Sequence, residues 1–232
     1  MVPDQLIILF EDNHLLAVAK PAGLLVQGDR TGDPTVLDQA RSYLKQKYNK
    51  PGHVYLGLVH RLDRPVSGVL LLARTSKAAG RLSQQFRTGK VTKTYLAVVS
   101  GRPIPDRGQL RAYLAPPAGR SGRTRAAGRP FTGAKEARLS YHVQNCLADH
   151  ALLEIQPGTG RRHQIRAQLA LIGHPIVGDV KYGARQALPD LSIGLHALRL
   201  VVAHPVGGDQ LVLTAPLPVG WPWPPLPDKN DR

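Results

Sequence analysis

The sequence has a single cysteine, Cys146, among its 232 residues. One thiol cannot form an internal disulfide, and there is no second cysteine with which to build a structural zinc site. Long apolar runs are also absent, and the opening stretch MVPDQLIILFEDNH lacks the basic region of a signal peptide. We therefore expect a soluble protein of a reducing compartment, the cytoplasm, with no membrane association.

Acidic residues are scarce: 16 Asp and Glu face 31 Lys and Arg, which gives a formal net charge of +15. A protein of this charge attracts polyanions, and each phosphate that it neutralises releases counterions. Nucleic acid is thus the leading candidate partner, although a merely basic or ribosome-associated protein has the same composition. No segment pairs a basic helical face with a face of Trp, Phe and Leu, which disfavours binding to a membrane surface.

Common motifs for metals, nucleotides and hydrolysis are missing. The nine histidines form no His-Glu-x-x-His pattern, and there is no Cys-x-x-Cys. Residues 158–163, GTGRRH, begin like a phosphate-binding loop but lack the Lys-Ser/Thr of a P-loop and the third glycine of a dinucleotide turn. Ser67 is not part of a Gly-x-Ser-x-Gly elbow. We predict neither a metal nor a cofactor.

Strand and helix patterns are mixed along the chain without internal repeats, and the length suits one domain with a single large core. Short apolar runs predict strands at residues 6–10, 15–19, 69–73, 94–99, 151–155, 195–202 and 210–214. Helical spacing predicts a helix from the N-cap Asp33 to about Tyr48 and another from the N-cap Ser76 to about Phe86. A third helix is predicted at residues 163–172.

Two segments depart from this pattern. Residues 116–135 have five basic residues, no acid, and abundant Gly and Pro, so we predict a basic flexible loop. An arm that contacts RNA and orders on binding has the same composition. Its arginines are Arg120, Arg123, Arg125 and Arg129. Residues 221–232 are predicted to be a proline-rich tail, whose two tryptophans either pack on the body, which we favour, or stack with bases.

A single carboxylate, Asp63, lies between Arg61 and Arg64 in the stretch VHRLDRPVSGVLLLARTSK, residues 59–77. Guanidinium groups favour the ionised form of a nearby carboxylate, and an ionised carboxylate suits a nucleophile or a base better than a proton donor. A structural Asp–Arg pair in a turn gives the same pattern. The spacing alone leaves both interpretations open.

Four stretches carry motifs that can be compared with a known family. HRLDRPVSGVLLLARTSKAA begins at His60, and KVTKTYLAVVSG spans residues 90–101. GTGRRHQIRAQLALIGHPIVGDVKYG spans residues 158–183, and LHALRLVVAHP spans residues 195–205. In this order they resemble four motifs of the RluA-type pseudouridine synthases: the His-Arg-Leu-Asp motif, the Lys-x-Tyr strand, the Gly-Arg-x-His-Gln-Ile-Arg helix with its Gly-Asp-x-x-Tyr-Gly sequel, and the Leu-His-Ala strand. The resemblance covers nearly the whole chain.

The resemblance implies an α+β fold in one catalytic domain, residues 1–220, with a mixed, mainly antiparallel sheet, flanking helices and a central active-site cleft. It implies an isomerase that converts uridine to pseudouridine in rRNA or tRNA without a cofactor. Asp63 would be the catalytic carboxylate, either as nucleophile or as the base that removes the C2′ proton. Arg166 would keep it charged and oriented. Tyr95 would lie against the base, with its hydroxyl as a candidate proton acceptor at C5, and Leu195 would form an apolar wall.

The target uridine must leave its stack, and the resemblance implies that Arg61 fills the vacated space. Arg64, Arg162 and His163 fall in the same motifs and are expected at the substrate, His163 as a hydrogen-bonded residue rather than an acid–base catalyst. Val66 and Arg162 stand where the family commonly has threonine, at positions without a catalytic role. The chain leaves no room at its start for the S4 RNA-binding domain of many relatives, so we expect the catalytic domain and the basic loop to capture RNA.

The main alternative is a non-catalytic RNA-binding protein on the same fold. A base-flipping deaminase is disfavoured, because the His and Cys zinc ligands of that class are missing. We expect a monomer whose partner is RNA, either rRNA or tRNA, with no obligate protein partner.

Overall fold

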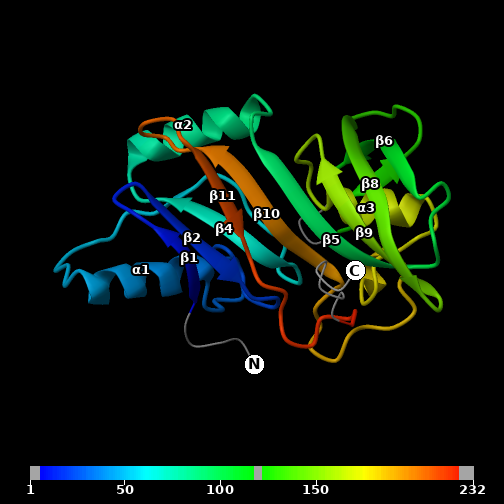
Figure 1. The fold of residues 1–232 in the computed structure, drawn as a ribbon, viewed down its shortest axis with the longest axis horizontal. Coiled ribbons are helices and arrows are strands. Elements are labelled where there is room, and N and C mark those ends of the chain that lie inside the picture. The colour runs from blue at the N-terminus through cyan, green and yellow to red at the C-terminus, as the bar shows by residue number, and fades with distance from the viewer. Residues whose placement is uncertain (1–5, 118–121, 225–232) are drawn as a thin grey trace, which may run out of the picture.

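The computed structural model describes residues 6–117 and 122–224. One mixed sheet of eleven strands runs through it in the order β1-β2-β4-β10-β5-β9-β8-β6-β7, with β3 beside β4 and β11 beside β10 (Figure 1). The strands are β1 Ile7–Glu11, β2 Leu15–Lys20, β3 Gly57–Leu58, β4 Ser67–Ala73, β5 Thr92–Ser100, β6 Arg107–Ala115, β7 Arg125–Ala127, β8 Lys135–Leu147, β9 His150–Pro157, β10 Leu195–Ala203 and β11 Gln210–Thr214. Among these described strands, only β4 and β10 pair in parallel. The predicted mainly antiparallel sheet is confirmed.

The described helices are α1 Val36–Lys47, α2 Ser76–Arg87 and α3 Gln164–Leu171, followed by a short 3₁₀ turn, η1 Val180–Tyr182. The three predicted helices are therefore present. None of the helices in residues 6–117 and 122–224 is both long and apolar enough to cross a bilayer.

Both predicted N-caps were wrong. The Thr35 hydroxyl, rather than Asp33, accepts from the Asp38 backbone N–H at the start of α1, and the Thr75 hydroxyl, rather than Ser76, accepts from the Ala78 N–H at the start of α2. Both threonines have the extended backbone that an N-cap needs. The Asp33 carboxylate instead pairs with Arg64 at 2.8 Å, a long-range contact that no local pattern contains.

The N-terminal half has helices on both faces of the sheet (Figure 1). Successive side chains of a strand point to opposite faces. Accordingly, Leu16 and Leu72 pack with α1 on one face, whereas Leu15 and Leu71 pack with α2 on the other. All seven residues of β4 are buried. The turn that precedes β4, which carries Asp63, is thus attached to a rigid central strand.

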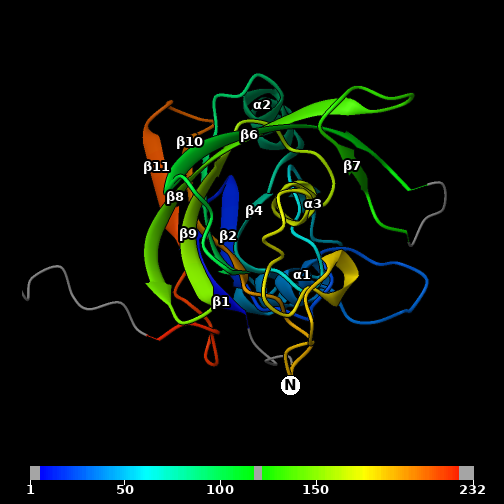
Figure 2. The same cartoon turned by 90° about the vertical axis from the view of Figure 1, so that its right-hand side faces the viewer.

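In the C-terminal half, the sheet curves around α3 (Figure 2). Ile165 and Leu169 of α3 pack in one core with side chains of β5, β8 and β9, among them Leu153 and Tyr141. The side chain of Gln168 donates to the backbone oxygens of β6 and β8, which attaches the polar side of α3 to the same strands. This packing fixes the position of Arg166 in the middle of the helix.

The predicted flexible loop, residues 116–135, is partly a strand. Residues 125–127 form β7, which pairs with β6, and the buried Thr124 donates from its hydroxyl to the Arg162 carbonyl. Ala126 packs beside Ala167 of α3 and Tyr182. The predicted flexible loop thus contains a short strand at residues 125–127, which a search for apolar runs does not reveal because small side chains such as Ala126 do the packing there. Arg120 lies outside the described residues.

The start of the tail packs on the body. Trp223 is buried against Leu96 and Val98 of β5 and Leu152 of β9, with Trp221 partly buried beside the same cluster. The preference for packing over base stacking is confirmed for these two tryptophans.

Candidate active site

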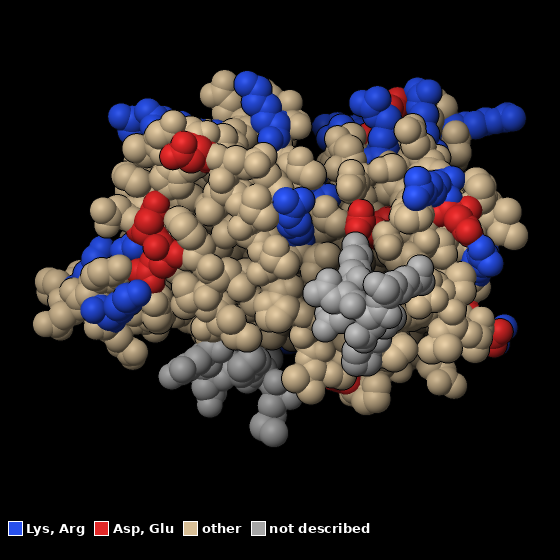
Figure 3. All heavy atoms as spheres, in the orientation of Figure 1, with Lys and Arg blue, Asp and Glu red and all other residues tan. Residues whose placement is uncertain are grey.

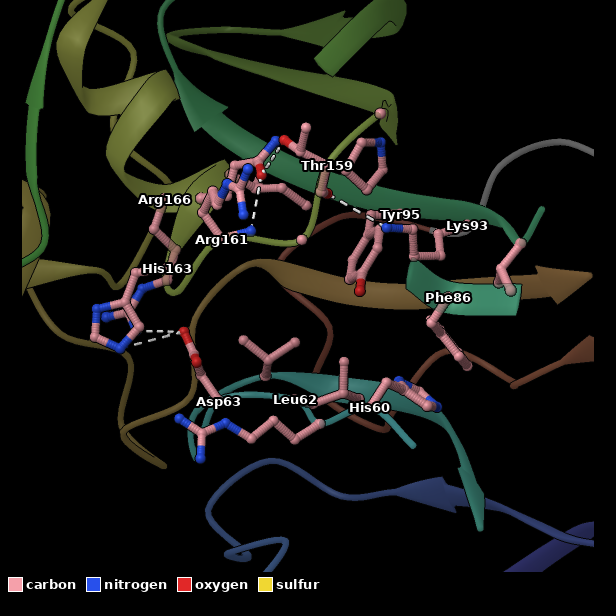
Figure 4. A pocket seen from close by; sticks show the side chains of 18 of the residues that line it. His60, Leu62, Asp63, Phe86, Lys93, Tyr95, Thr159, Arg161, His163 and Arg166 are labelled. Atoms are coloured by element: carbon pink, nitrogen blue, oxygen red, sulfur yellow. Dashed lines mark hydrogen bonds and ion pairs between the residues drawn. The ribbon is translucent and has the colours of Figure 1, made fainter. Parts of the chain in front are cut away.

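A cavity of about 660 Å³ opens over β5, within the size range of small-molecule sites. Its walls come from the turn before β4, the end of α2, β5, the loop before α3, α3 itself and the start of β10 (Figure 4). Six of the residues predicted from the sequence line it: Arg61, Asp63, Tyr95, His163, Arg166 and Leu195. Segments far apart in the sequence therefore meet in one cleft.

Two predicted substrate-binding residues are not brought to this cavity. Arg64 turns the other way: its Nε donates to the Gly23 carbonyl at 2.9 Å, and its Nη2 pairs with Asp33 at 2.8 Å. Arg162 is not part of the cavity wall, and its carbonyl accepts from Thr124. Arg64 thus holds the loop that carries Asp63 through Gly23 and Asp33, not through an ion pair with Asp63 itself.

The Asp63 turn is fixed from beneath. The Arg64 carbonyl accepts from the buried Lys20 Nζ at 3.1 Å and from the Gly23 N–H at 2.8 Å, and the Val66 N–H closes the turn on the Asp63 carbonyl. Burial lowers the pKa of Lys20 to about 7, while the charge of Asp63 works in the opposite direction. The turn is therefore tied at its backbone, and the Asp63 side chain remains partly open to the cavity.

Gly68 allows the Asp63 turn to lie close to strand β10. Its φ is +121°, and a Cβ there would overlap the backbone of Ala197 on β10. This is the parallel contact between β4 and β10, in which Gly68 pairs with Ala197. Close approach at this point brings Asp63 and Leu195 into the same cleft.

Arg166 joins two carboxylates. Its Nη1 donates to Asp63 Oδ2 at 2.9 Å, and its Nε and Nη2 donate to the two oxygens of Asp179 at 2.7 and 2.8 Å. The ring of Tyr182 lies 5.0 Å from the guanidinium. Burial opposes the charge of Arg166, but hydrogen bonds and charges from Asp179 and then Asp63 raise its pKa. Arg166 is a permanent cation whose orientation Asp179 fixes.

His163 links this group to the basic loop of residues 116–135, called the basic hairpin below because its strand β7 pairs with β6. Its Nδ1 lies 2.9 Å from the Tyr182 hydroxyl, which accepts from the Thr124 N–H and so has its own proton for Nδ1. Its Nε2 lies 3.6 Å from Asp63 Oδ2. Burial lowers the pKa of His163 to about 4. The charge of Asp63 raises this pKa, whereas the charge of Arg166 lowers it further. A neutral, hydrogen-bonded His163 fits its expected structural role.

Tyr95 and Leu195 provide the apolar part of the cleft. Tyr95 projects from β5 into the cavity between Asp63 and Lys93 (Figure 4), and Leu195 is a buried residue at the start of β10. Burial, and then the charge of Asp63, raises the pKa of Tyr95. Its phenol is therefore protonated throughout the neutral range.

Sequence reasoning missed the roles of Asp179 and Tyr182. Both lie in the Gly-Asp-x-x-Tyr-Gly stretch after α3, so the signal was present, but spacing did not reveal that this turn folds back under Arg166. Within residues 6–117 and 122–224, no three His, Cys, Asp or Glu side chains gather into a group suited to a metal ion.

The cleft contains a carboxylate, a paired arginine and a tyrosine on the strand and helix that the motifs indicated. A family model described as RNA pseudouridylate synthase matches residues 14–171. The chain belongs to the RNA pseudouridylate synthase family. This confirms the predicted family and enzyme class, an RNA pseudouridine synthase, which is an isomerase.

Named relatives of this pseudouridine synthase include proteins that act on different RNAs. It is 37% identical to tRNA pseudouridine synthase C of Pectobacterium carotovorum subsp. carotovorum, over 92% of this chain and 60% of that protein. It is also 37% identical to tRNA pseudouridine synthase C of Yersinia pestis, over 90% and 85% of the two chains. Ribosomal large subunit pseudouridine synthase D of Nitrosomonas europaea is 35% identical, over 91% of this chain and 62% of that protein.

Solved structures show the same fold. Human RNA Pseudouridylate Synthase Domain Containing 4 aligns with a TM-score of 0.77 at 28% identity, over 92% of this chain and 89% of that chain. Human RNA Pseudouridylate Synthase Domain Containing 1 aligns with a TM-score of 0.74 at 27% identity, over 94% and 87% of the two chains. The predicted pseudouridine synthase fold is confirmed.

Proposed function

We propose that this pseudouridine synthase isomerises uridine to pseudouridine within a transfer or ribosomal RNA, with Asp63 as the carboxylate that acts on the nucleotide. The observation that carries the proposal is the Asp63–Arg166 pair at 2.9 Å in the wall of the cavity. In the reaction, the bond from uracil N1 to C1′ breaks, the base turns, and C5 bonds to C1′. The C5 proton leaves and N1 gains one, so the product is an isomer.

Of the two carboxylate oxygens of Asp63, Oδ2 contacts Arg166 and His163, which leaves Oδ1 to contact a substrate. Among the described residues, the hydrogen bond from Arg166 and the contact with His163 both reach Oδ2. The Asp63 side chain is 26% exposed, against 6% for Arg166. Oδ1 can therefore meet the ribose, either by attack at C1′ or by removal of the C2′ proton, while Arg166 holds the carboxylate in place through Oδ2.

The base is proposed to lie between Tyr95 and Leu195. The raised pKa of Tyr95 means that its hydroxyl is a proton donor in the resting enzyme. To accept the C5 proton, it must pass its own proton on, and Asp63, whose charge acts on Tyr95, is the group proposed to receive it. Stacking by the ring requires no such transfer.

Capture of RNA is proposed to use the basic edge of the molecule. On the face shown in Figure 3, Lys and Arg side chains gather along the upper edge, on both sides of a notch. Arg61 is exposed at the cavity, where it can enter the space that the flipped uridine vacates. On the hairpin, Arg123 lies over Tyr182 at 5.1 Å and Arg125 over Phe131 at 5.0 Å, so two of the proposed RNA-binding arginines are already held in place.

Release of tritium from C5 tests the proposal. Purified protein is incubated with unmodified tRNA and rRNA transcripts that carry tritium at uracil C5. We expect the wild type to release tritium to water, and Asp63→Asn to release none while binding RNA within a few-fold of the wild type. The matched control is Asp149→Asn, an exposed carboxylate in the β8–β9 turn, which we expect to behave like the wild type.

Two results would overturn the proposal. If the wild type binds these RNAs without releasing tritium, the protein is an RNA-binding protein on this fold. If Asp63→Asn turns over substantially, Asp63 is not the catalytic carboxylate. Sequencing the product RNA for pseudouridine then identifies the modified position.

A further inference from the structure

The cavity extends beyond the residues that the proposed reaction uses. Asp63 and Arg166 lie at one end, and Tyr95 projects toward the middle (Figure 4). Lys93 and Phe86 line the opposite end, beyond Tyr95. A uridine whose ribose meets Asp63 and whose base meets Tyr95 leaves this far end unfilled.

Lys93 places a positive charge at the far end, with one hydrogen bond from its ammonium group within the described residues. It lies two residues before Tyr95 on β5 and thus faces the same side of the sheet. Its Nζ donates to the Thr159 carbonyl at 3.3 Å, and within the described residues it forms no ion pair with a carboxylate. An ammonium has three donors. Burial lowers its pKa, and an anion in the cavity would offset that cost.

The carbonyl that holds Lys93 is itself fixed. The Gln164 side-chain oxygen accepts from the Thr159 hydroxyl at 2.6 Å and from the Arg161 N–H at 3.0 Å. The loop before α3 is therefore rigid where Lys93 touches it, and Lys93 is aimed rather than freely mobile.

Phe86 adds an aromatic surface next to Lys93. Its ring stacks on the imidazole of His60, with centroids 4.9 Å apart and an interplanar angle of 19°. His60 in turn accepts from the Leu71 N–H of the buried strand β4. Phe86 is thus held at the end of α2 by a rigid partner and lines the cavity. A preset aromatic ring beside a cation is the arrangement that binds a base together with its phosphate.

We propose that this end of the cavity is a subsite for the nucleotide next to the target uridine, in which Lys93 binds a phosphate and Phe86 stacks with the base. The inference rests on the proposed function, because it takes an RNA whose target uridine lies at Asp63 as the occupant. A uridine within a chain has a phosphodiester on either side of its ribose, so an anion necessarily enters the cleft with it. The subsite makes the identity of the neighbouring nucleotide part of substrate choice.

Salt dependence tests the phosphate contact. Binding of unmodified tRNA and rRNA transcripts is titrated at several salt concentrations for the wild type, Lys93→Met and the control Lys45→Met, an exposed lysine on α1. We expect the slope of log affinity against log salt to become shallower by about 0.7 in Lys93→Met, and not in Lys45→Met. Lys93→Arg should restore the slope. An unchanged slope in Lys93→Met overturns the contact.

A neutral linkage identifies which phosphate is bound. In the transcript that the wild type modifies, a methylphosphonate replaces the phosphate on one side of the target uridine at a time. One replacement should weaken wild-type binding about tenfold and weaken Lys93→Met no further. If both replacements weaken Lys93→Met as much as the wild type, Lys93 binds something other than these phosphates.

An abasic neighbour tests the stacking. Replacing the flanking base with an abasic residue should raise the KM of the wild type about tenfold, with little added effect in Phe86→Leu. Phe86→Trp should keep the wild-type response. Equal losses in the wild type and Phe86→Leu overturn the stacking role. If the wild type modifies no transcript, the proposed function fails, while the salt slopes still report whether Lys93 contacts RNA.

Discussion

The two carboxylates that share Arg166 differ in exposure. Asp179 is 1% exposed and takes two hydrogen bonds from the guanidinium, whereas Asp63 takes one and is 26% exposed. Asp179 therefore sets the direction of Arg166 independently of what Asp63 does. During a reaction, Asp63 can change its charge or form a bond without releasing the arginine.

Arg166→Met should affect rate and stability together. We expect pseudouridine formation to slow by about 100-fold or more, because Asp63 loses the hydrogen-bond donor and positive charge that orient it. We also expect the free energy of unfolding to fall by about 3–5 kcal/mol, because Asp179 is left buried without its partner. Single-turnover rates and urea unfolding measure the two effects.

A second substitution separates these effects. Adding Asp179→Asn to Arg166→Met removes the buried unpaired charge and should recover much of the stability but none of the rate. A normal rate in the less stable single variant would show that Arg166 only holds the fold.

Tyr95→Phe should keep the fold and the affinity for RNA, because the ring and its packing stay. If the hydroxyl passes a proton during the reaction, turnover should fall by about 10²–10⁴-fold. Since the pKa of Tyr95 is raised, the rate of the wild type should show no tyrosine ionisation between pH 6 and about pH 10. The pH dependence of single-turnover rates checks this, and normal turnover of the phenylalanine variant would leave Tyr95 with stacking alone.

At the scale of elements, the basic hairpin is the one most open to test. Replacing Arg123, Arg125 and Arg129 with serine should weaken RNA binding and make the salt slope shallower by up to about two units, at about 0.7 for each lost contact. Catalysis at saturating RNA should change much less. Stability should barely change, because the three side chains are exposed.

The control for the hairpin removes the same charge elsewhere. Arg41, Lys45 and Lys50 lie in or just after α1 and are exposed. Their replacement with glutamine should leave the slope as in the wild type. Identical slopes for the hairpin variant and this control would show that RNA is bound by another surface.

Apolar periodicity correctly predicted helices and strands in which a continuous row of apolar side chains is buried. The predicted strand at 210–214 matches β11, and the three helices were found with errors only at their ends. The strands β6 and β8 were missed. β6 reads RGQLRAYLA, with exposed and half-buried residues alternating over its first half, because one face of this outer strand packs and the other meets solvent. Charged residues on the solvent face hide the strand from a search for apolar runs.

For the candidate site, the sequence predicted which residues take part but not all of the contacts between them. Asp63, Tyr95 and Arg166 came from motifs, and the structure brings them into one cavity. The prediction placed Arg64 at the substrate and did not recognise the role of Asp179, and both errors have the same cause. Each depends on which of several oppositely charged groups is nearest in space, and the sequence does not contain that distance.

At the scale of the whole molecule, acid should destabilise the fold through histidines. Burial is the largest cause that lowers the pKa of His60, His163 and His196 to about 4. In the unfolded chain they titrate near pH 6.5. Between these values the unfolded state binds more protons, so stability is complete above about pH 6.5 and falls as the pH drops toward 4.

Urea unfolding at a series of pH values measures this loss, for which His60 alone should account for about 3 kcal/mol. His60→Gln should flatten the dependence between pH 6.5 and 4, whereas His53→Gln, at an exposed position, should not. An equal slope in both variants would mean that His60 is not the group that takes up the proton.

The parallel contact of β4 with β10 joins parts of the proposed site that are synthesised far apart in time. β4 ends at residue 73, but its neighbour in the sheet begins only at residue 195. A chain emerging from the ribosome has Asp63 long before it has Arg166 or the wall formed by Leu195. On the proposed function, a nascent chain therefore lacks a complete site until the last third of the protein has been made.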